Sequence, residues 1–324
     1  MTSLSAWQQL LRKNFTNWEK LSDFLEWNEE HRNHVLKKPN FPLNLPFRLA
    51  EKIQKGTLND PILLQFLPTQ NEMQKAPGFI SDPVADEGFR KESKLLHKYQ
   101  GRALLVCTGA CAMHCRYCFR QNFSYDNEDR TYVRELEILA QDSSINEIIL
   151  SGGDPLSLTN AVLKSLIEKL SAIPHIKKIR FHTRFPVGIP ERIDSEFLEI
   201  LASTNTQFWF ILHSNHPNEL DDDVLRSLKN VQKTGAVVLN QSVLLKGVND
   251  GVQTLKRLCE VLVDNGIVPY YLHQLDRVTG SSHFEVSEKT GALLIAELTK
   301  MLPGYAVPKY VREVAGEPSK ITLA

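Results

Sequence analysis

Between residues 103 and 275, apolar runs rich in β-branched and aromatic residues alternate with segments of helical period. The runs occupy residues 103–108, 147–150, 176–185, 208–213, 236–245 and 267–275. Between them lie LTNAVLKSLIEKLSAI, SEFLEILAST, DDDVLRSLKNVQKTG and VQTLKRLCEVLVDNG, in which apolar residues recur at helical spacing. The last two segments close on Gly235 and Gly266, as helices that end in a glycine do. The alternation predicts an α/β fold with parallel strands joined by right-handed crossovers.

The length of the alternating part limits the choice among α/β folds. A closed barrel of eight strand–helix units takes about 250 residues, whereas the chain shows six units. We therefore predict a partial (βα)6 barrel that resembles an incomplete TIM barrel. A doubly wound sheet is the structural alternative.

The chain divides into three predicted parts. Residues 1–95 hold three of the four tryptophans and the proline-punctuated stretch KKPNFPLNLPFRLAEKI. They predict a mostly helical region packed on the barrel. Residues 96–282 are the predicted barrel core, and residues 283–324 are a predicted C-terminal helix with a short final segment.

Composition excludes several function classes. The 324 residues include 38 basic and 38 acidic side chains, so no excess of charge favours nucleic acid or a membrane surface as partner. The stretch MTSLSAWQQLLRKNF lacks the apolar core of a signal peptide, and no apolar run approaches the roughly 20 residues of a membrane span. Only five cysteines are present, and three are clustered, which argues against a disulfide framework. We expect a cytoplasmic protein.

The cysteine cluster is CAMHCRYC, with Cys111, Cys115 and Cys118 inside eight positions. A zinc ribbon needs two separated cysteine pairs, and a redox dithiol needs one pair. Three thiolates without a fourth suit a cubane iron–sulfur cluster with one iron left open. The alternatives are a structural zinc site completed by His114 or by a distant ligand, and three unrelated thiols. Cys107 and Cys259 lie in apolar patterns and are predicted to be core residues.

Unusual residues follow each of the six predicted strands. Because the carboxyl ends of parallel strands share one rim, these residues should lie close together. The motifs, in chain order, are CTGACAMHCRYCFR, SGGDP, HTRFP, LHSNHPNEL, NQSVLLKGVND and LHQLDR. Their coincidence on one rim predicts an active site there.

These motifs resemble those of a known family. The spacing of the three cysteines is that of radical S-adenosylmethionine (SAM) enzymes. The stretches LLVCTGACAMHCRYCFR, SGGDP, HTRFPVGIPERI, HSNHPNEL, NQSVLLKGVND and PYYLHQLD are similar to those of lysine 2,3-aminomutases. The resemblance is greatest to the bacterial branch that makes β-lysine for elongation factor P. It runs from NDPILLQFLP, near residue 59, to the C-terminus.

The resemblance implies a radical SAM fold and three cofactors. It assigns a [4Fe–4S] cluster to Cys111, Cys115 and Cys118, with SAM on the open iron. One electron then cleaves SAM to a radical that abstracts hydrogen from the β-carbon of an amino acid. Further SAM-pocket positions are implied at Gly152, Gly153, Asp154, His213 and Gln241. The third cofactor, pyridoxal phosphate (PLP), is implied to be held by Lys320, which would also be catalytic.

The resemblance also implies how the substrate is held. Arg120 matches the residue that binds the substrate carboxylate, and Asp276 matches one that receives the lysine ε-ammonium. Glu313 stands where the family has a second aspartate, so its carboxylate extends one methylene further.

The implied activity is isomerisation of L-lysine to (R)-β-lysine. The implied partners are an electron donor of the flavodoxin or ferredoxin type, elongation factor P and its lysylating enzyme. Two alternatives stay open: the same chemistry on another amino acid such as glutamate, and a zinc-stabilised binding module without catalysis. The acidic pair Asp276 and Glu313 favours lysine over glutamate.

Overall fold

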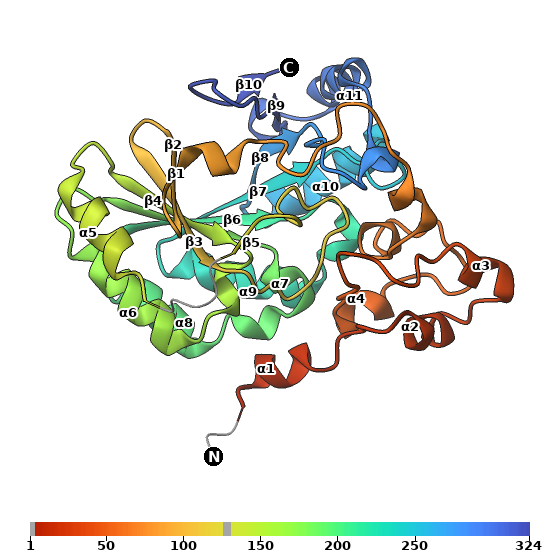
Figure 1. Cartoon of the computed structure of the whole chain (residues 1–324), viewed down its shortest axis with the longest axis horizontal. Helices are drawn as coiled ribbons and strands as arrows, with labels where there is room; N and C mark the ends of the chain where they lie inside the picture. Colours follow the sequence, from red (N-terminus) through yellow and green to blue (C-terminus); the bar gives the residue numbers. More distant parts are fainter. Residues whose placement is uncertain (1–3, 126–130) are drawn as a thin grey trace.

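The computed structural model describes residues 4–125 and 131–324, so residues 1–3 of the predicted N-terminal region lie outside the described residues. The described residues form a ten-stranded sheet whose order in space follows the order in the chain (Figure 1). The strands are β1 (Arg90–Glu92), β2 (Leu95–Tyr99), β3 (Arg102–Thr108), β4 (Glu147–Gly152), β5 (Lys178–Thr183), β6 (Gln207–His213), β7 (Val237–Val243), β8 (Val268–His273), β9 (Lys309–Arg312) and β10 (Ile321–Thr322). The strands from β3 to β9 pair in parallel, while β1, β2 and β10 are antiparallel additions at the edges. The sheet is not closed, because β1 and β10 lie at opposite ends of the strand order.

This topology confirms the predicted partial barrel. All six predicted strands are present, as β3 to β8. A doubly wound sheet reverses its strand order at a switch point, and the strand order of the described part does not reverse. The prediction missed a seventh parallel strand, β9, whose four residues KYVR are too few for alternation to identify.

Helices cover the convex side of the sheet (Figure 1). They are α5 (Val133–Gln141), α6 (Asn160–Ser171), α8 (Ser195–Ala202), α9 (Asp222–Lys233), α10 (Val252–Asp264) and α11 (Glu288–Met301). Oxygen side chains cap several N-termini, as Asp221 does for the backbone N–H of Val224. Gly235 and Gly266 follow α9 and α10 with φ of +89° and +70°, which confirms them as helix-ending glycines. Among the described residues, none of the helices combines the length and apolar character that a membrane crossing requires.

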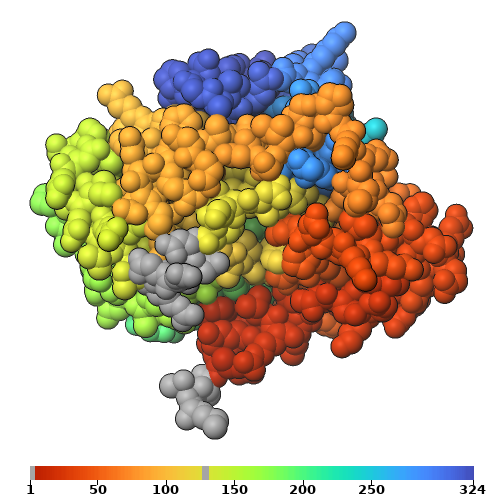
Figure 2. All heavy atoms as spheres, viewed as in Figure 1, coloured from red at the N-terminus to blue at the C-terminus, as the bar shows by residue number. Residues whose placement is uncertain are grey.

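The N-terminal region consists of short helices and connecting segments that pack on the barrel. The helices are α1 (Ala6–Leu11), α2 (Trp18–Phe24), α3 (Glu29–Asn33) and α4 (Phe47–Glu51). Trp7 packs edge-on against Phe185 of α7 (Phe185–Gly188), with ring centroids 5.6 Å apart. Lys52 after α4 pairs with Asp221 at 2.8 Å. Figure 2 shows this region, in red and orange, covering one side of the molecule. The boundary predicted after residue 95 falls within β2, after its first residue.

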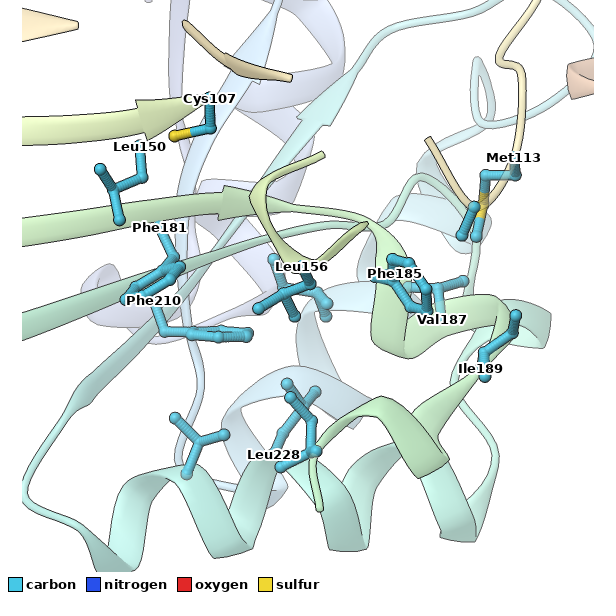
Figure 3. Close-up of a cluster of buried hydrophobic side chains, with 14 of the residues drawn as sticks. Cys107, Met113, Leu150, Leu156, Phe181, Phe185, Val187, Ile189, Phe210 and Leu228 are labelled. Carbon is cyan, nitrogen blue, oxygen red and sulfur yellow. The ribbon is translucent and has the colours of Figure 1, made fainter. Parts of the chain in front are cut away.

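The main core lies between the sheet and its helices. Figure 3 shows Leu150, Phe181 and Phe210 projecting from neighbouring strands toward Leu228 of α9. Phe181 stacks in a tilted arrangement on Phe210, with centroids 5.9 Å apart. Cys107 and Cys259 are both buried, which confirms them as core residues.

Helix α11 holds β9 against the barrel. Gly291 lets the helix approach Tyr310 so closely that an added Cβ would lie 2.3 Å from the phenol Cζ atom. The Tyr310 hydroxyl donates to Gln274 just after β8. Strand β9 then leads directly to Glu313 and the final segment.

Gly291→Ala should therefore destabilise the protein. Overpacking of a core typically costs about 1–3 kcal/mol, whereas the higher helix propensity of alanine recovers only about 1 kcal/mol. We expect the free energy of unfolding, measured by urea titration with circular dichroism, to fall. Gly304→Ala is the matched control, because an added Cβ there meets nothing within 4 Å. Equal stability of the two variants would contradict this packing role.

Candidate active site

A cavity of about 470 Å³ lies on the concave side of the sheet and reaches the loops that follow the strands. Alternate strand residues line it, as expected where one face of a sheet turns inward. All twelve site residues predicted from the sequence line this cavity, namely Cys111, Cys115, Cys118, Arg120, Gly152, Gly153, Asp154, His213, Gln241, Asp276, Glu313 and Lys320. The structure therefore brings together residues that are up to 209 positions apart, since they run from Cys111 to Lys320.

The cysteine loop follows β3 and is held by the N-terminal region. Asn44 Nδ2 donates to the carbonyl of Cys111 at 3.3 Å, and Asn14 Nδ2 donates to that of Ala112 at 2.7 Å. The backbone N–H of His114 donates to the carbonyl of Asn44 at 3.0 Å. These bonds satisfy loop backbone groups that would otherwise need water.

The SGGDP motif, at the end of β4, forms backbone hydrogen bonds with the same loop. The N–H of Gly153 donates to Thr108 at 2.7 Å, and the N–H of Asp154 donates to Ala110 at 2.8 Å. A Cβ on Gly153 would lie 2.4 Å from the Ala110 oxygen, and Gly152 has φ of +107°. Both positions therefore require glycine, and the requirement comes from this close backbone approach.

The carboxylate of Asp154 forms hydrogen bonds with other groups of the protein. It accepts from the Thr183 hydroxyl at 2.7 Å and from the N–H groups of Arg184, Phe185 and Leu156 at 2.8–3.0 Å. Burial raises the pKa of Asp154 although these donors favour its charged form. The side chain thus ties the loop after β4 to the end of β5.

The three cysteines suit a cluster better than a single metal ion. In residues 4–125 and 131–324, no three His, Cys, Asp or Glu side chains converge on a point where one ion could sit. A cubane does not need such convergence, because each thiolate binds a different iron. His114 bonds through Nδ1 to the Pro42 carbonyl at 2.9 Å and stacks on Phe41, so it is engaged away from the cavity. Burial raises the pKa of Cys118 to about 11, so a cation is needed to form its thiolate near neutral pH.

A buried polar network that the sequence did not predict adjoins Cys115. Arg184 Nη1 donates to Cys115 Sγ at 2.9 Å and contacts the Tyr117 hydroxyl. Its Nη2 donates to Gln65 at 2.6 Å and to Glu219 at 2.9 Å. The motifs HTRFP and LHSNHPNEL contain Arg184 and Glu219, and the stretch NDPILLQFLP contains Gln65, but none of the three was predicted as a site residue.

Neutral imidazoles line the middle of the cavity. His213 and Gln241 face each other across β6 and β7, with Nε2 atoms 2.8 Å apart. Burial lowers the pKa of His213 to about 3, and it also lowers the pKa values of His182 and His273. The Nε2 atoms of His182 and His273 have no hydrogen-bond partner among the described residues. These two nitrogen atoms are therefore available to form hydrogen bonds with a bound polar group.

The far end of the cavity is strongly charged. Lys320 Nζ donates to Glu313, whose other oxygen accepts from Lys98 at 2.9 Å. Burial opposes ionisation of Glu313, but Lys320 and Lys98 outweigh it and lower its pKa to about 2. Burial, reinforced by the charge of Glu313, raises the pKa of Asp276 to about 7. The basic side chains around this end fit an anionic cofactor such as PLP, and they are Lys98, Arg102, Arg180, Lys309 and Lys320.

Arg120 lies between the two ends. Its Nε donates to Asp86 at 2.8 Å, and its Nη1 donates to the Ser151 hydroxyl at 3.3 Å. Asp86 was also missed from the sequence, because it lies in the irregular N-terminal region where no periodic pattern marks it.

Comparisons with known proteins bear on this site. Residues 105–259 match the family model described as Radical SAM superfamily. The L-lysine 2,3-aminomutase of Haemophilus influenzae is 41% identical over 299 residues, covering 91% of this chain and 88% of that protein. The L-lysine 2,3-aminomutase of Escherichia coli is 43% identical over 289 residues, covering 88% and 84%. A crystal structure of Streptococcus suis SuiB bound to S-adenosylmethionine shares the fold, with a TM-score of 0.51 at 16% identity, covering 68% of this chain and 52% of that one.

The buried network predicts a large cost for Glu219→Gln. The substitution keeps the shape but removes the charge that faces Arg184, and it turns one accepting oxygen into a donor. Breaking a buried ion pair costs about 3–5 kcal/mol, which anaerobic chemical denaturation should detect.

The matched control is Glu191→Gln. Glu191 pairs with Arg48 at 3.2 Å at the surface, where such pairs contribute less than about 1 kcal/mol. Similar losses in the two variants would show that the Arg184 network is not a principal support of the loop ends.

Proposed function

This chain belongs to the radical SAM lysine 2,3-aminomutase family, and from that premise we propose that it converts L-lysine to (R)-β-lysine. The observation that carries the proposal is the convergence of all twelve predicted residues on one cavity. The two relatives at 41% and 43% identity, both named L-lysine 2,3-aminomutase, support the same reaction.

Radical SAM membership implies a [4Fe–4S] cluster and SAM, and we propose PLP as a further cofactor. When bound, the cluster and SAM supply a carbon radical, and PLP supplies a covalent hold on the migrating nitrogen. We propose that Cys111, Cys115 and Cys118 hold the cluster and that Lys320 holds PLP.

The residues of the chain have three proposed tasks. The paired strand ends exclude water and hold the cysteine loop at one end of the cavity, through Gly153 and Asp154. The neutral side chains of His213 and Gln241 present hydrogen-bonding atoms without adding charge beside SAM. Lys320 lies at the other end, where Glu313 pairs with its ammonium group.

Charge at both ends of the substrate determines the proposed specificity. Arg120 Nη2 forms no hydrogen bond with the described residues, so it can donate to the substrate carboxylate. Asp276, in its ionised form, can accept from the ε-ammonium. Glutamate would bring its side-chain carboxylate to Asp276 and Glu313, where like charges repel.

Three further assignments complete the proposal. The product would be used to modify a lysine of elongation factor P by way of its lysylating enzyme. The electron would come from a donor of the flavodoxin or ferredoxin type, and the reaction would take place in the cytoplasm. The motif resemblance supports these assignments.

The decisive experiment is anaerobic incubation of the purified chain with SAM, PLP, a reductant and L-lysine. We expect chiral chromatography to detect (R)-β-lysine, and no product when SAM or PLP is omitted. Faster rearrangement of glutamate, or no rearrangement of lysine, would overturn the proposal.

Two cysteine variants serve as the matched pair for this experiment. Cys115→Ala should lose both bound iron and product formation, because the loop would keep only two thiolates. Cys259→Ala should keep both, since Cys259 lies in the core on α10, outside the cavity.

The pKa of Asp276 predicts how lysine binding depends on pH. A pKa of about 7 leaves this carboxyl mostly protonated at pH 6 and mostly ionised at pH 8. Only the ionised form attracts an ammonium group, so the KM for lysine should fall roughly tenfold over that interval. Asp276→Asn should abolish this dependence and raise KM about ten- to a hundredfold at pH 8.

Glu313→Gln tests the contribution that the charge of Glu313 adds to burial in raising the pKa of Asp276. Removing the negative charge beside Asp276 should move the midpoint of the KM profile to lower pH. An unmoved midpoint would contradict this contribution of Glu313.

A further inference from the structure

We propose that Asp86 is a positioning residue that orients Arg120 toward the carboxylate of the substrate. Through Lys98, it also links this anchor to Glu313 and Lys320. The inference rests on the proposed function and deepens it, since neither the sequence motifs nor the comparisons assign any role to Asp86.

Asp86 belongs to a continuous chain of alternating charges along the cavity wall. Arg120 Nε lies 2.8 Å from one Asp86 oxygen, and Lys98 Nζ lies 3.1 Å from the other. Lys98 Nζ also lies 2.9 Å from Glu313, which pairs in turn with Lys320. All five side chains line the cavity. The predicted carboxylate anchor and the predicted cofactor lysine are therefore joined by four consecutive ion pairs.

The contact with Asp86 determines which edge of the Arg120 guanidinium is left for a ligand. Asp86 accepts from Nε, so the Nε edge is occupied by protein. On the outer edge, Nη1 meets only the neutral Ser151 hydroxyl at 3.3 Å, and Nη2 forms no hydrogen bond with the described residues. A carboxylate binds such an outer edge through two parallel N–H donors. Asp86 thus fixes the fork in the orientation that a substrate carboxylate needs.

The backbone before Asp86 adopts a conformation that costs free energy. Ala85 has φ of +53° and ψ of +42°, a left-handed conformation that residues with a side chain seldom adopt. Asp82 stabilises the turn, since its carboxylate accepts from the N–H of Asp86 at 3.0 Å and of Glu87 at 3.2 Å. Strained residues persist where surrounding contacts impose them, and they cluster at functional sites. Here the strain brings a carboxylate from the N-terminal region into the cavity wall.

The charge chain spans the open side of the barrel. Lys98 lies on β2 and Glu313 directly follows β9, near opposite ends of the strand order. Figures 1 and 2 show the orange segment with β1 and β2 beside the blue C-terminal segment with β9 and β10. Asp86 is 2% exposed. A carboxylate buried this deeply is costly unless it is paired, and both cations that pair with it face the cavity.

The role predicts a specific kinetic signature. Anchoring of the carboxylate acts on substrate and transition state alike, so its loss raises KM more than it lowers kcat. Asp86→Asn removes the charge and presents an amide donor to Arg120 or Lys98. Asp86→Glu keeps the charge but displaces the guanidinium of Arg120 by the length of a methylene. This second variant keeps the test possible if Asp86→Asn folds poorly.

The test compares L-lysine with L-lysinamide, in which a carboxamide replaces the carboxylate. Anaerobic calorimetry on the PLP- and cluster-loaded protein gives the dissociation constants, and turnover of lysine gives KM and kcat. We expect each Asp86 variant to bind lysine at least tenfold more weakly and lysinamide within about twofold of the unaltered protein. A purely structural role would weaken both ligands equally.

Glu72→Gln is the matched control. Glu72 pairs with the buried Arg116 of the cysteine loop at 2.8 Å but does not line the cavity. It should lower stability and leave the lysine-to-lysinamide ratio unchanged. If the unaltered protein rearranges lysine and the Asp86 variants keep its affinity, the positioning role is wrong and the proposed function stands. If the unaltered protein neither binds nor rearranges lysine, both are wrong.

Discussion

The buried Nη atoms of Arg184 need acceptors, and that requirement organises the end of the molecule that holds the cysteine loop. Its Nη atoms reach Cys115, Gln65 and Glu219, which come from the cysteine loop, the N-terminal region and the loop after β6. The charge cannot be desolvated stably unless all of these segments are in place. The hydrogen bonds of Arg184 therefore hold these three segments together and fix the position of Cys115, one of the predicted cluster ligands.

The middle of the cavity and its far end differ in their electrostatics. Between the two ends, burial lowers the pKa of His213 to about 3, so this side chain offers hydrogen-bonding atoms without adding charge. Near Lys320, acidic and basic groups alternate, and the pKa of Glu313 falls to about 2 while that of Asp276 rises to about 7. Two carboxyl groups in one wall thus adopt different protonation near neutral pH. Burial opposes ionisation of both groups, but at Glu313 the charges of Lys320 and Lys98 outweigh it, whereas at Asp276 the charge of Glu313 adds to it.

Prediction from the sequence succeeded where the physical signal is local or periodic. The apolar runs of β3 to β8 gave the sheet, and residues that follow strand ends converged, as parallel topology requires. Strand β9 was missed because four residues carry too little periodicity. Asp86 and Gln65 were missed for another reason: each acts through a partner far away in the chain, 34 and 119 residues respectively. Nothing in their local sequence encodes those contacts. The pairing of Glu313 with Lys98 could not be predicted from the sequence either, because it depends on the curvature of the open sheet.

The N-terminal region is part of the active site in physical terms, although it lies outside the barrel repeat. Asn14 and Asn44 hold the backbone of the cysteine loop. Asp86 reaches the opposite end and pairs there with Arg120 and Lys98. In a closed eight-unit barrel, further strands would occupy the open side of the sheet. In the described part of this chain, β1 and β10 are the two ends of the strand order, and the irregular backbone before β1 contributes Asp86 to the charge chain between the two edges of the sheet. The open barrel and its N-terminal region therefore form one structural unit, because residues that line the cavity are held in place from both.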